Sequence, residues 1–246
     1  MAADLFDQKL RALRRERALR RGPELFLHER AFEDIVERLA LIQRRFRSAL
    51  LIGSFGPDWR DRLLRCADSV TVVEADALMS LEPGSYDLCV AVGELDTTAD
   101  LPQALLTVRF ALQEDALFIG VLPGGDSLPT LRSAMRAADE VIGGATPHVH
   151  PRIEPAGLTS LLTSAGLSMP VVDVDRVQAS YRSFRDLVRD LRSMGATNIL
   201  NARSRRPLTR SAASAAAAQF MADAVDGRAT EVFELLHFAA WTPPAP

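Results

Sequence analysis

The sequence predicts an α/β fold built around a parallel, doubly wound sheet. A short apolar strand, Leu50–Ile52, runs into a glycine turn that opens a helix, and strands then alternate with amphipathic helices up to residue 123. Strands joined through helices at this rhythm lie parallel, because each crossover returns the chain to the same edge of the sheet. Each predicted strand ends in a residue suited to a turn or a ligand contact: Gly53, Glu74, Gly93 and Pro123.

Two helices are predicted ahead of the sheet, at residues 4–21 and about 25–47. The second carries apolar side chains three and four residues apart, and this stripe must pack on another element. We therefore expect an N-terminal helical lid or packing element over the sheet. In the first helix the following arginines are expected to be exposed: Arg11, Arg14, Arg15 and Arg17.

The remaining elements follow from the same periodicities. Strands are predicted at residues 50–52, 70–73, 86–92 and 117–122, with helices between them at 58–66 and 101–112. The second half adds helices at 128–141, 155–165, 184–194 and 211–224, a strand at 171–177 and a last, antiparallel edge strand at 232–241. Without a repeat or a long linker, a single domain is expected, with N-terminal helices at 1–47, a core sheet at 48–123 and the rest of the sheet with helical insertions at 124–246.

Composition narrows the functional classes. The chain has 246 residues, 48% of them hydrophobic, and a formal net charge of −3, which argues against nucleic acid as its partner. Its only cysteines, Cys66 and Cys89, lack the spacing of a metal site and indicate a reducing compartment. No apolar run has the length of a membrane span. These features together predict a bacterial cytoplasmic protein.

The glycine turn after the first strand is the first candidate site. A helix that starts at Pro57 points its N-terminal N–H groups toward whatever occupies the turn, and glycine lets a ligand approach the backbone closely. Gly53, Ser54 and Gly56 are therefore candidates for binding a nucleotide-type cofactor. The alternative is a plain connection from a strand to a helix.

Alternating strands with a glycine turn after the first and an acid after the second resemble the class I S-adenosylmethionine (SAM)-dependent methyltransferases, and so imply a Rossmann-like sheet. Several further stretches are similar to the methyltransferase-like assembly factors of respiratory complex I and their bacterial relatives. These stretches are residues 83–88, 100–105, 124–128, 147–151, 172–176, 190–198 and 233–243, with Phe6-Asp7 and residues 26–30 near the start. The methyltransferases that cap a carrier-bound malonyl group in biotin synthesis are a more distant likeness.

The resemblance implies SAM as cofactor, with Glu74 accepting hydrogen bonds from both ribose hydroxyls. The cofactor-binding candidates are Gly53, Ser54, Gly56, Glu74, Gly93 and Glu94. Several positions depart from the family pattern. Leu51 replaces an acid, Phe55 and Pro57 replace glycines, and Asp96-Thr97 replaces a His-Trp pair.

The spacing of the strands departs from the family as well. Glu74 and Tyr86 are only 12 positions apart, which is too short for a helix and a strand. One β–α unit is therefore predicted to be missing, and the adenine pocket that it would wall is expected to be open.

Polar side chains elsewhere are weaker candidates for substrate contact. Asp96, His148 and Tyr181 are the catalytic candidates, and His148 with His150 lacks the further ligands that a metal would need, so no metal site is expected. A basic loop could dock an acidic partner protein or could simply be solvated. Its arginines are Arg203, Arg205, Arg206 and Arg210.

Three functions remain open at this stage. The first is a SAM-dependent methyl transfer, which asks of the protein little beyond alignment of the reactants. The second is a non-catalytic assembly or scaffold protein that holds another polypeptide, and Phe55, Pro57 and the missing unit favour it. The third is carboxyl methylation in the biotin pathway. In the complex I branch the resemblance also implies arginine hydroxylation as a possible chemistry.

Overall fold

The computed structural model describes residues 5–53 and 55–244 of the chain. They form two compact units, each assembled from separate segments. The sheet unit comprises Leu25–Gly124, Arg152–Asp175 and the described residues from Leu235 onward, and the helical unit comprises the described residues up to Glu24, Gly125–Pro151 and Arg176–Glu234. The single domain expected from the sequence stays a prediction.

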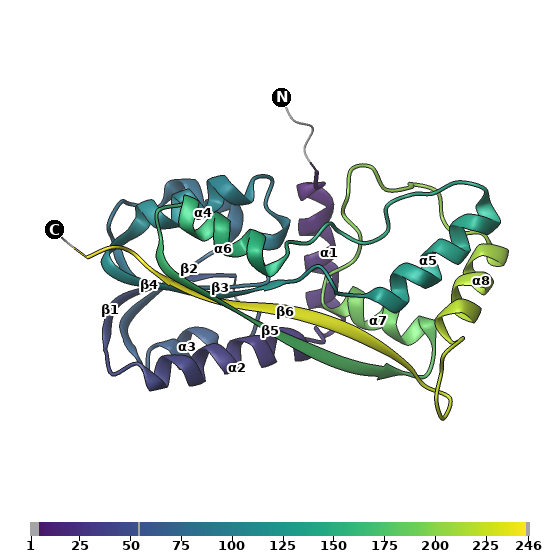
Figure 1. The fold of residues 1–246 in the computed structure, drawn as a ribbon, viewed down its shortest axis with the longest axis horizontal. Coiled ribbons are helices and arrows are strands. Elements are labelled where there is room, and N and C mark those ends of the chain that lie inside the picture. Colours follow the sequence, from purple (N-terminus) through teal and green to yellow (C-terminus); the bar gives the residue numbers. More distant parts are fainter. Residues whose placement is uncertain (1–4, 54, 245–246) are drawn as a thin grey trace. The chain divides into compact units, whose positions relative to one another are not determined.

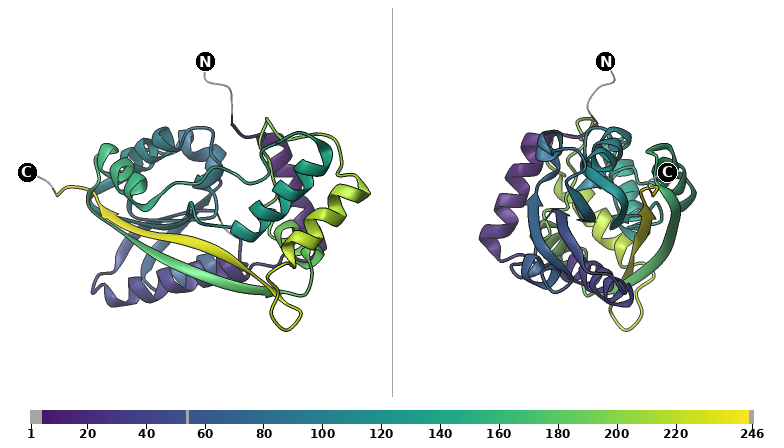
Figure 2. Two further views of the ribbon diagram at one scale, coloured as in Figure 1. Left: turned by 45° about the vertical axis from the view of Figure 1, so that its right-hand side comes forward. Right: turned by 90° about the vertical axis from the view of Figure 1, so that its left-hand side faces the viewer.

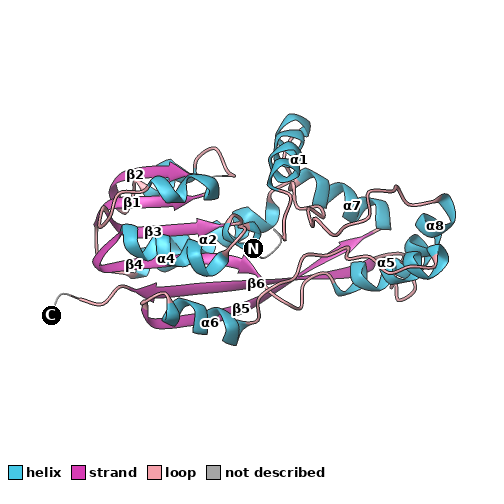
Figure 3. Ribbon diagram, turned by 90° about the horizontal axis from the view of Figure 1, so that it is seen from above, coloured by secondary structure: helices cyan, strands magenta, loops and turns pink. Residues whose placement is uncertain are grey.

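The sheet has six strands in the order β2-β1-β3-β4-β6-β5 (Figure 3). Its parallel strands are β1 (Phe46–Ile52), β2 (Ala67–Val73), β3 (Tyr86–Val92) and β4 (Leu112–Pro123). β6 (Ala229–Trp241) pairs antiparallel with β4, as predicted, but it lies inside the sheet. The edge position predicted for it is wrong, because β5 (Ser168–Tyr181) covers its far side.

Helices cover both faces of this sheet (Figures 1 and 2). α2 (Phe26–Leu41) and α3 (Trp59–Leu63) lie on one face, and α4 (Leu101–Ala111) and α6 (Pro155–Ser164) lie on the other. Apolar side chains of α4 and α6 pack on β1, β3, β4 and β6 in one continuous core. The sheet therefore has the doubly wound α/β architecture that the strand and helix pattern predicts.

α2 ends earlier than the apolar spacing predicts. Phe46, which continues the helical stripe in the sequence, is fully buried and pairs with Ala67 as the first residue of β1. α2 packs on α3, β3 and β4, so the second of the two N-terminal helices is a packing element over the sheet.

The connection between β2 and β3 confirms that one β–α unit is missing. The described chain between Val73 and Tyr86 contains only a 3₁₀ helix, η1 (Ala75–Ser80), and β2 is left as the edge of the sheet. Val72 on this strand is 41% exposed. A second 3₁₀ helix, η2 (Leu95–Thr97), follows β3.

The helical unit is built from two helix pairs. α1 (Gln8–Arg21) packs on α7 (Phe184–Ser193), and α5 (Pro129–Ile142) packs along α8 (Arg210–Phe220), which also contacts α7 (Figure 2). The buried carboxylate of Glu231 accepts hydrogen bonds from two backbone N–H groups at the start of α5, at 3.2 Å from Thr130 and 2.7 Å from Leu131. No helix within the described residues is long and apolar enough to cross a membrane.

A buried carboxylate fixes the start of β1 against β3. Asp87 is 4% exposed, and its side chain accepts hydrogen bonds from the backbone N–H groups of Arg47, at 2.9 Å, and Ser48, at 3.0 Å. Charged hydrogen bonds of this kind satisfy donors that the pairing of the two strands leaves over.

Replacing Asp87 by Asn is expected to destabilise the protein by roughly 1–3 kcal/mol, because the amide removes the charge and presents a donor to two N–H donors. The free energy of unfolding in urea measures this. Asp68→Asn is the matched control, since Asp68 forms a 2.6 Å ion pair with Arg45 in which both side chains are 59% exposed. That control should change stability by less than about 0.5 kcal/mol. Equal losses in the two variants would contradict the role given to Asp87.

Candidate functional site

The carboxyl ends of β1, β2 and β3 meet at the glycine turn. The Gly53 N–H donates a 2.9 Å hydrogen bond to the carbonyl of Val73, and the Ala75 N–H donates to the Glu94 carboxylate at 3.4 Å. Gly53 and Gly93 have positive φ angles of 78° and 69°, which side-chain-bearing residues rarely adopt. Gly53, Gly56, Glu74, Gly93 and Glu94 follow the carboxyl ends of these three strands, and Ser54 lies outside the described residues. Their roles in binding a cofactor stay predictions.

The face of Gly56 is already covered by the chain itself. A Cβ atom built on Gly56 would lie 2.2 Å from Nε1 of Trp59 and 2.4 Å from Oε1 of Glu29. Trp59 is fully buried, and its Nε1–H donates a 2.9 Å hydrogen bond to Glu29. The indole and the carboxylate therefore occupy the space over the turn that its glycine leaves free.

The other two glycines are covered in the same way. A Cβ atom on Gly53 would lie 2.3 Å from Cγ of Glu94, whose side chain is fully buried. A Cβ atom on Gly93 would lie 2.8 Å from the His28 ring and 3.1 Å from the Phe55 ring. Each glycine makes room for a side chain of this protein.

The covering side chains form what we call the aromatic plug, made of His28, Phe32, Phe55 and Trp59. The rings of His28 and Phe55 stack at 4.4 Å, and those of Phe32 and Trp59 stack at 4.2 Å with 3° between their planes. The guanidinium of Arg62 lies 4.9 Å from the centre of the Phe32 ring, a cation–π contact that adds to the stacking.

This geometry does not fit SAM bound against the glycine turn. A cofactor of this kind needs a bare backbone at the turn, so that its polar groups reach the N–H donors at the start of the helix. Here Trp59 and Glu29 lie over Gly56, and Phe55 and His28 lie over Gly93. Glu74, the candidate ribose ligand, is exposed at the end of the edge strand β2.

Ion pairs on α2 hold the helix that supplies His28, Glu29 and Phe32. Arg30 pairs with Asp175 of β5 at 2.8 Å, and Arg38 pairs with Asp173 of the same strand at 2.6 Å. Asp34 lies 2.8 Å from Nδ1 of His237, which is 4% exposed on β6. Burial lowers the pKa of His237 below its ordinary value, against the opposing effect of the Asp34 carboxylate.

Comparison of sequences finds no matching family model but several curated relatives. The mouse arginine-hydroxylase NDUFAF5 is 28% identical over 98% of this chain and 78% of its own length, and the zebrafish protein of the same name is 30% identical over 87% and 64%. The malonyl-[acyl-carrier protein] O-methyltransferase of Xylella fastidiosa is 34% identical over 75% of this chain and 59% of its own length.

Comparison with solved structures identifies the type of fold. A protein of Bacillus halodurans assigned to the methyltransferases matches with a TM-score of 0.55 at 10% identity, covering 85% of this chain and 98% of that one. The chain has the fold of the class I methyltransferases. The YcgJ protein of Bacillus subtilis matches with a TM-score of 0.51 at 10% identity, over 89% and 100% of the two chains, and supports the same Rossmann-like fold.

The catalytic candidates of this methyltransferase-like protein are held by structural contacts. In the sheet unit, Asp96 forms a largely buried ion pair with Arg152. In the helical unit, Nε2 of His148 lies 2.8 Å from the Asp139 carboxylate and 3.1 Å from the Thr146 hydroxyl. Asp96 thus belongs to a different unit from the other two candidates, and their catalytic roles stay predictions.

Two further residues of the helical unit complete the set of sequence candidates. Tyr181 is buried, and its burial, together with the nearby Asp190 and Glu231 carboxylates, raises the pKa of its hydroxyl. The Nε2 atom of His150 accepts a 3.0 Å hydrogen bond from the backbone of Ile199, which gives this histidine a structural role. Within the described residues, no group of three or more His, Cys, Asp and Glu side chains is arranged to hold a metal ion.

Sequence reasoning identified Phe55 as an obstacle to a cofactor but missed the other members of the plug. The only signal for them is indirect, because His28 and Glu29 lie in the stretch that resembles the assembly-factor family. Trp59 lies three residues after Gly56, where an indole folds back over the turn. That contact requires the packing of α2 on α3, which no local pattern encodes.

The His237 contact predicts a pH dependence of stability. A histidine whose folded pKa is depressed stays neutral while the unfolded chain takes up a proton, so the unfolding free energy falls as the pH drops below about 6.5. It falls until the pH passes the folded-state pKa, with a slope of at most about 1.4 kcal/mol per pH unit. Asp34, Arg38, Asp173 and Asp175 are the charged groups that act on this ring.

Urea unfolding between pH 5 and pH 8 measures this slope. The comparison is with His237→Gln, which cannot take up the proton, and only the pH slope is compared because the substitution of a buried residue shifts stability at every pH. The slope below pH 6.5 should be smaller in the variant. Parallel curves would rule out His237 as the source.

Proposed function

We propose that this methyltransferase-like protein works without SAM, as a scaffold that binds another polypeptide. The observation that carries the proposal is the position of Trp59 and Glu29 over Gly56, with Phe55 and His28 over Gly93. These side chains take the place of a ligand at the point where the fold would hold one. The resemblance to assembly factors of respiratory complex I supports a partner that is a protein under assembly.

The energy of the plug supports the same conclusion. Trp59 and Phe32 are fully buried and stacked, and removing such an aromatic from a core costs roughly 3–5 kcal/mol. If a cofactor had to displace Trp59, its binding free energy would be weaker by this amount. At about 1.4 kcal/mol per tenfold, its affinity would fall by roughly two to four orders of magnitude.

The missing β–α unit affects the part of the site that would hold the adenosine of SAM. With η1 as the whole connection between β2 and β3, the described chain provides no further strand beside β2 and leaves Glu74 exposed. An adenosine held there would gain less apolar burial than in a walled pocket. Both ends of a SAM-sized ligand therefore lose contacts.

Methyl transfer is the second candidate, and one observation favours it. Gly53, Glu74 and Gly93 still stand at the ends of β1, β2 and β3, where the fold places its cofactor. The relative from Xylella fastidiosa is a malonyl-carrier methyltransferase, and the mouse and zebrafish relatives are named arginine hydroxylases, so both chemistries are alternatives. Each of them requires that the crevice bind a small molecule.

Thermal unfolding with about 1 mM SAM is expected to give no shift of the midpoint. A site with a dissociation constant near 1 μM would add about 4 kcal/mol under these conditions, which raises the midpoint by roughly 8–16 °C. Titration calorimetry with SAM and with its demethylated product provides the second measurement. A midpoint rise of several degrees that saturates with SAM would overturn the proposal in favour of methyl transfer.

The double variant Phe55→Gly with Pro57→Gly tests whether the turn residues or the covering side chains limit SAM binding. It removes one of the two rings over Gly93 and restores an N–H donor, but His28 still covers Gly93, and Trp59 and Glu29 still cover Gly56. We expect SAM binding to remain undetectable. Phe110→Ala, at a phenylalanine that is 61% exposed on α4, is the control for loss of a ring elsewhere. A gain of SAM binding in the double variant alone would show that the turn, and not Trp59, closes the site.

A further inference from the structure

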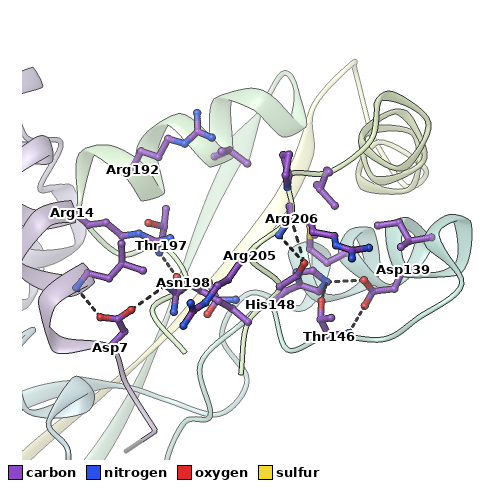
Figure 4. A pocket seen from close by; sticks show the side chains of 18 of the residues that line it. Asp7, Arg14, Asp139, Thr146, His148, Arg192, Thr197, Asn198, Arg205 and Arg206 are labelled. Carbon is purple, nitrogen blue, oxygen red and sulfur yellow. Dashed lines mark hydrogen bonds and ion pairs between the residues drawn. The ribbon is translucent and has the colours of Figure 1, made fainter. Parts of the chain in front are cut away.

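The helical unit contains a cavity of about 1230 Å³ whose lining is strongly positive (Figure 4). Among the described residues, seven arginines and only two aspartates line it. The arginines are Arg14, Arg17, Arg21, Arg192, Arg203, Arg205 and Arg206. The chain as a whole has a net charge of −3, so this positive charge is a local feature.

Both aspartates of the cavity are already engaged. Asp7 pairs with Arg203 at 3.0 Å and accepts the backbone N–H of Leu10 at 2.9 Å. Asp139 binds His148 at 2.8 Å and the backbone N–H of Thr146 at 3.2 Å (Figure 4). Neither carboxylate balances the remaining arginines.

Among residues 5–53 and 55–244, Arg203 is the only one of these seven arginines that forms an ion pair with a carboxylate, that of Asp7. The charges of Arg17, Arg192 and Arg203 act on Arg14, whose side chain donates a hydrogen bond to the carbonyl of Asn198. Burial, together with the charges of Arg203, Arg17 and Arg192, lowers the pKa of the Arg14 guanidinium. Folding therefore gathers like charges that a bound anion would stabilise.

The cavity is lined by residues of α1, α5 and α7 and of the loops that follow α5 and α7. Arg14, Arg17 and Arg21 are spaced three and four residues apart, so they lie on one face of α1. Arg192 stands in the last turn of α7, and α1 packs on this helix. The exposed loop of residues 203–209 closes the cavity beside the loop that carries His148.

We propose that this cavity binds an acidic segment of a partner polypeptide. The proposal rests on the scaffold function and names the chemistry of the partner that the scaffold holds. Guanidinium groups bind carboxylates through paired hydrogen bonds, and several unpaired arginines favour a ligand with several carboxylates.

The remaining lining favours a peptide over a nucleic acid. Apolar side chains lie between the arginines: Leu10, Met135, Ile142, Val188 and Leu208. No Phe, Tyr or Trp side chain of the described residues lines the cavity, and its one imidazole, His148, is bound to Asp139 and Thr146. Unpaired bases would therefore find little ring surface on which to stack. The cavity is also far larger than a single phosphate requires. Alternating carboxylates and apolar groups match this surface.

Fluorescence anisotropy with a labelled twelve-residue peptide, three repeats of Glu-Leu-Glu-Gly, tests the proposal. The same peptide with Gln in place of Glu is the uncharged control. At low salt the Glu peptide should bind at least about tenfold more tightly than the Gln peptide, and the difference should shrink as sodium chloride is raised.

Charge reversal locates the binding. Arg205→Glu with Arg206→Glu changes two exposed loop residues of the cavity and should weaken Glu-peptide binding at least about tenfold. Arg182→Glu with Arg185→Glu is the matched control, because both arginines are exposed in the helical unit and neither lines the cavity. That control should weaken binding less than about threefold, since distant exposed charges are screened.

Four results would overturn the proposal. The first three are an absence of Glu-peptide binding, equal losses in the two double variants, and displacement of the peptide by inorganic phosphate at an ionic strength where sodium chloride fails. A single-stranded dT12 that binds more tightly than the peptide and loses binding with Arg205→Glu/Arg206→Glu would also overturn it, in favour of nucleic acid. SAM binding by the wild type would remove the scaffold function without changing these results, because the substitutions leave the glycine turn intact.

Discussion

The contact of Trp59 with Gly56 determines what this sheet can bind. The indole lies over the turn, donates to Glu29 and stacks on Phe32, so α2, α3 and the glycine turn are tied by one buried side chain. Ion pairs of α2 with Asp173 and Asp175 of β5 hold that helix in place. The glycine turn, where methyltransferases hold a cofactor, is here covered by the buried Trp59 and by the partly buried His28, Glu29 and Phe55.

The two units differ in how far their charged side chains are paired. In the sheet unit, the carboxylates and arginines of α2 and β5 neutralise each other across short distances, as Arg38 does with Asp173. In the helical unit, α1, α7 and the loop of residues 203–209 assemble arginines without enough carboxylates to balance them. Uncompensated charge costs folding free energy, and it is retained where a ligand of opposite sign gains from it.

Sequence periodicity predicts most elements because their apolar patterns are local. β3 is predicted with its observed bounds, Tyr86–Val92, since a buried strand stands between Gly84 and Gly93. Phe46 is assigned to the wrong element because its spacing continues the stripe of α2, while strand pairing with Ala67 decides its place. The place of β6 inside the sheet depends on β5, a strand far away in the sequence.

The two sites differ in how much the sequence reveals. The loop arginines are visible as a basic run, and the face shared by Arg14, Arg17 and Arg21 is visible as helical spacing. Of the four arginines predicted to be exposed on α1, only Arg17 is; Arg11, Arg14 and Arg15 are half-buried. The meeting of Arg14, Arg17 and Arg21 with Arg192 depends on the packing of α1 on α7. The aromatic plug cannot be predicted from the sequence for a similar reason. Trp59 has the pattern of an ordinary core residue, and its hydrogen bond to Glu29 depends on the position of α2.

The glycines themselves show why a motif of this kind does not by itself indicate a ligand. Gly53 and Gly93 adopt positive φ angles that the path of the chain requires, and a Cβ atom on either would collide with Glu94 or His28. Replacing them would strain the backbone and displace buried side chains whether or not a cofactor were present. Packing alone therefore accounts for glycine at these two positions, and the turn by itself is evidence for the fold rather than for SAM.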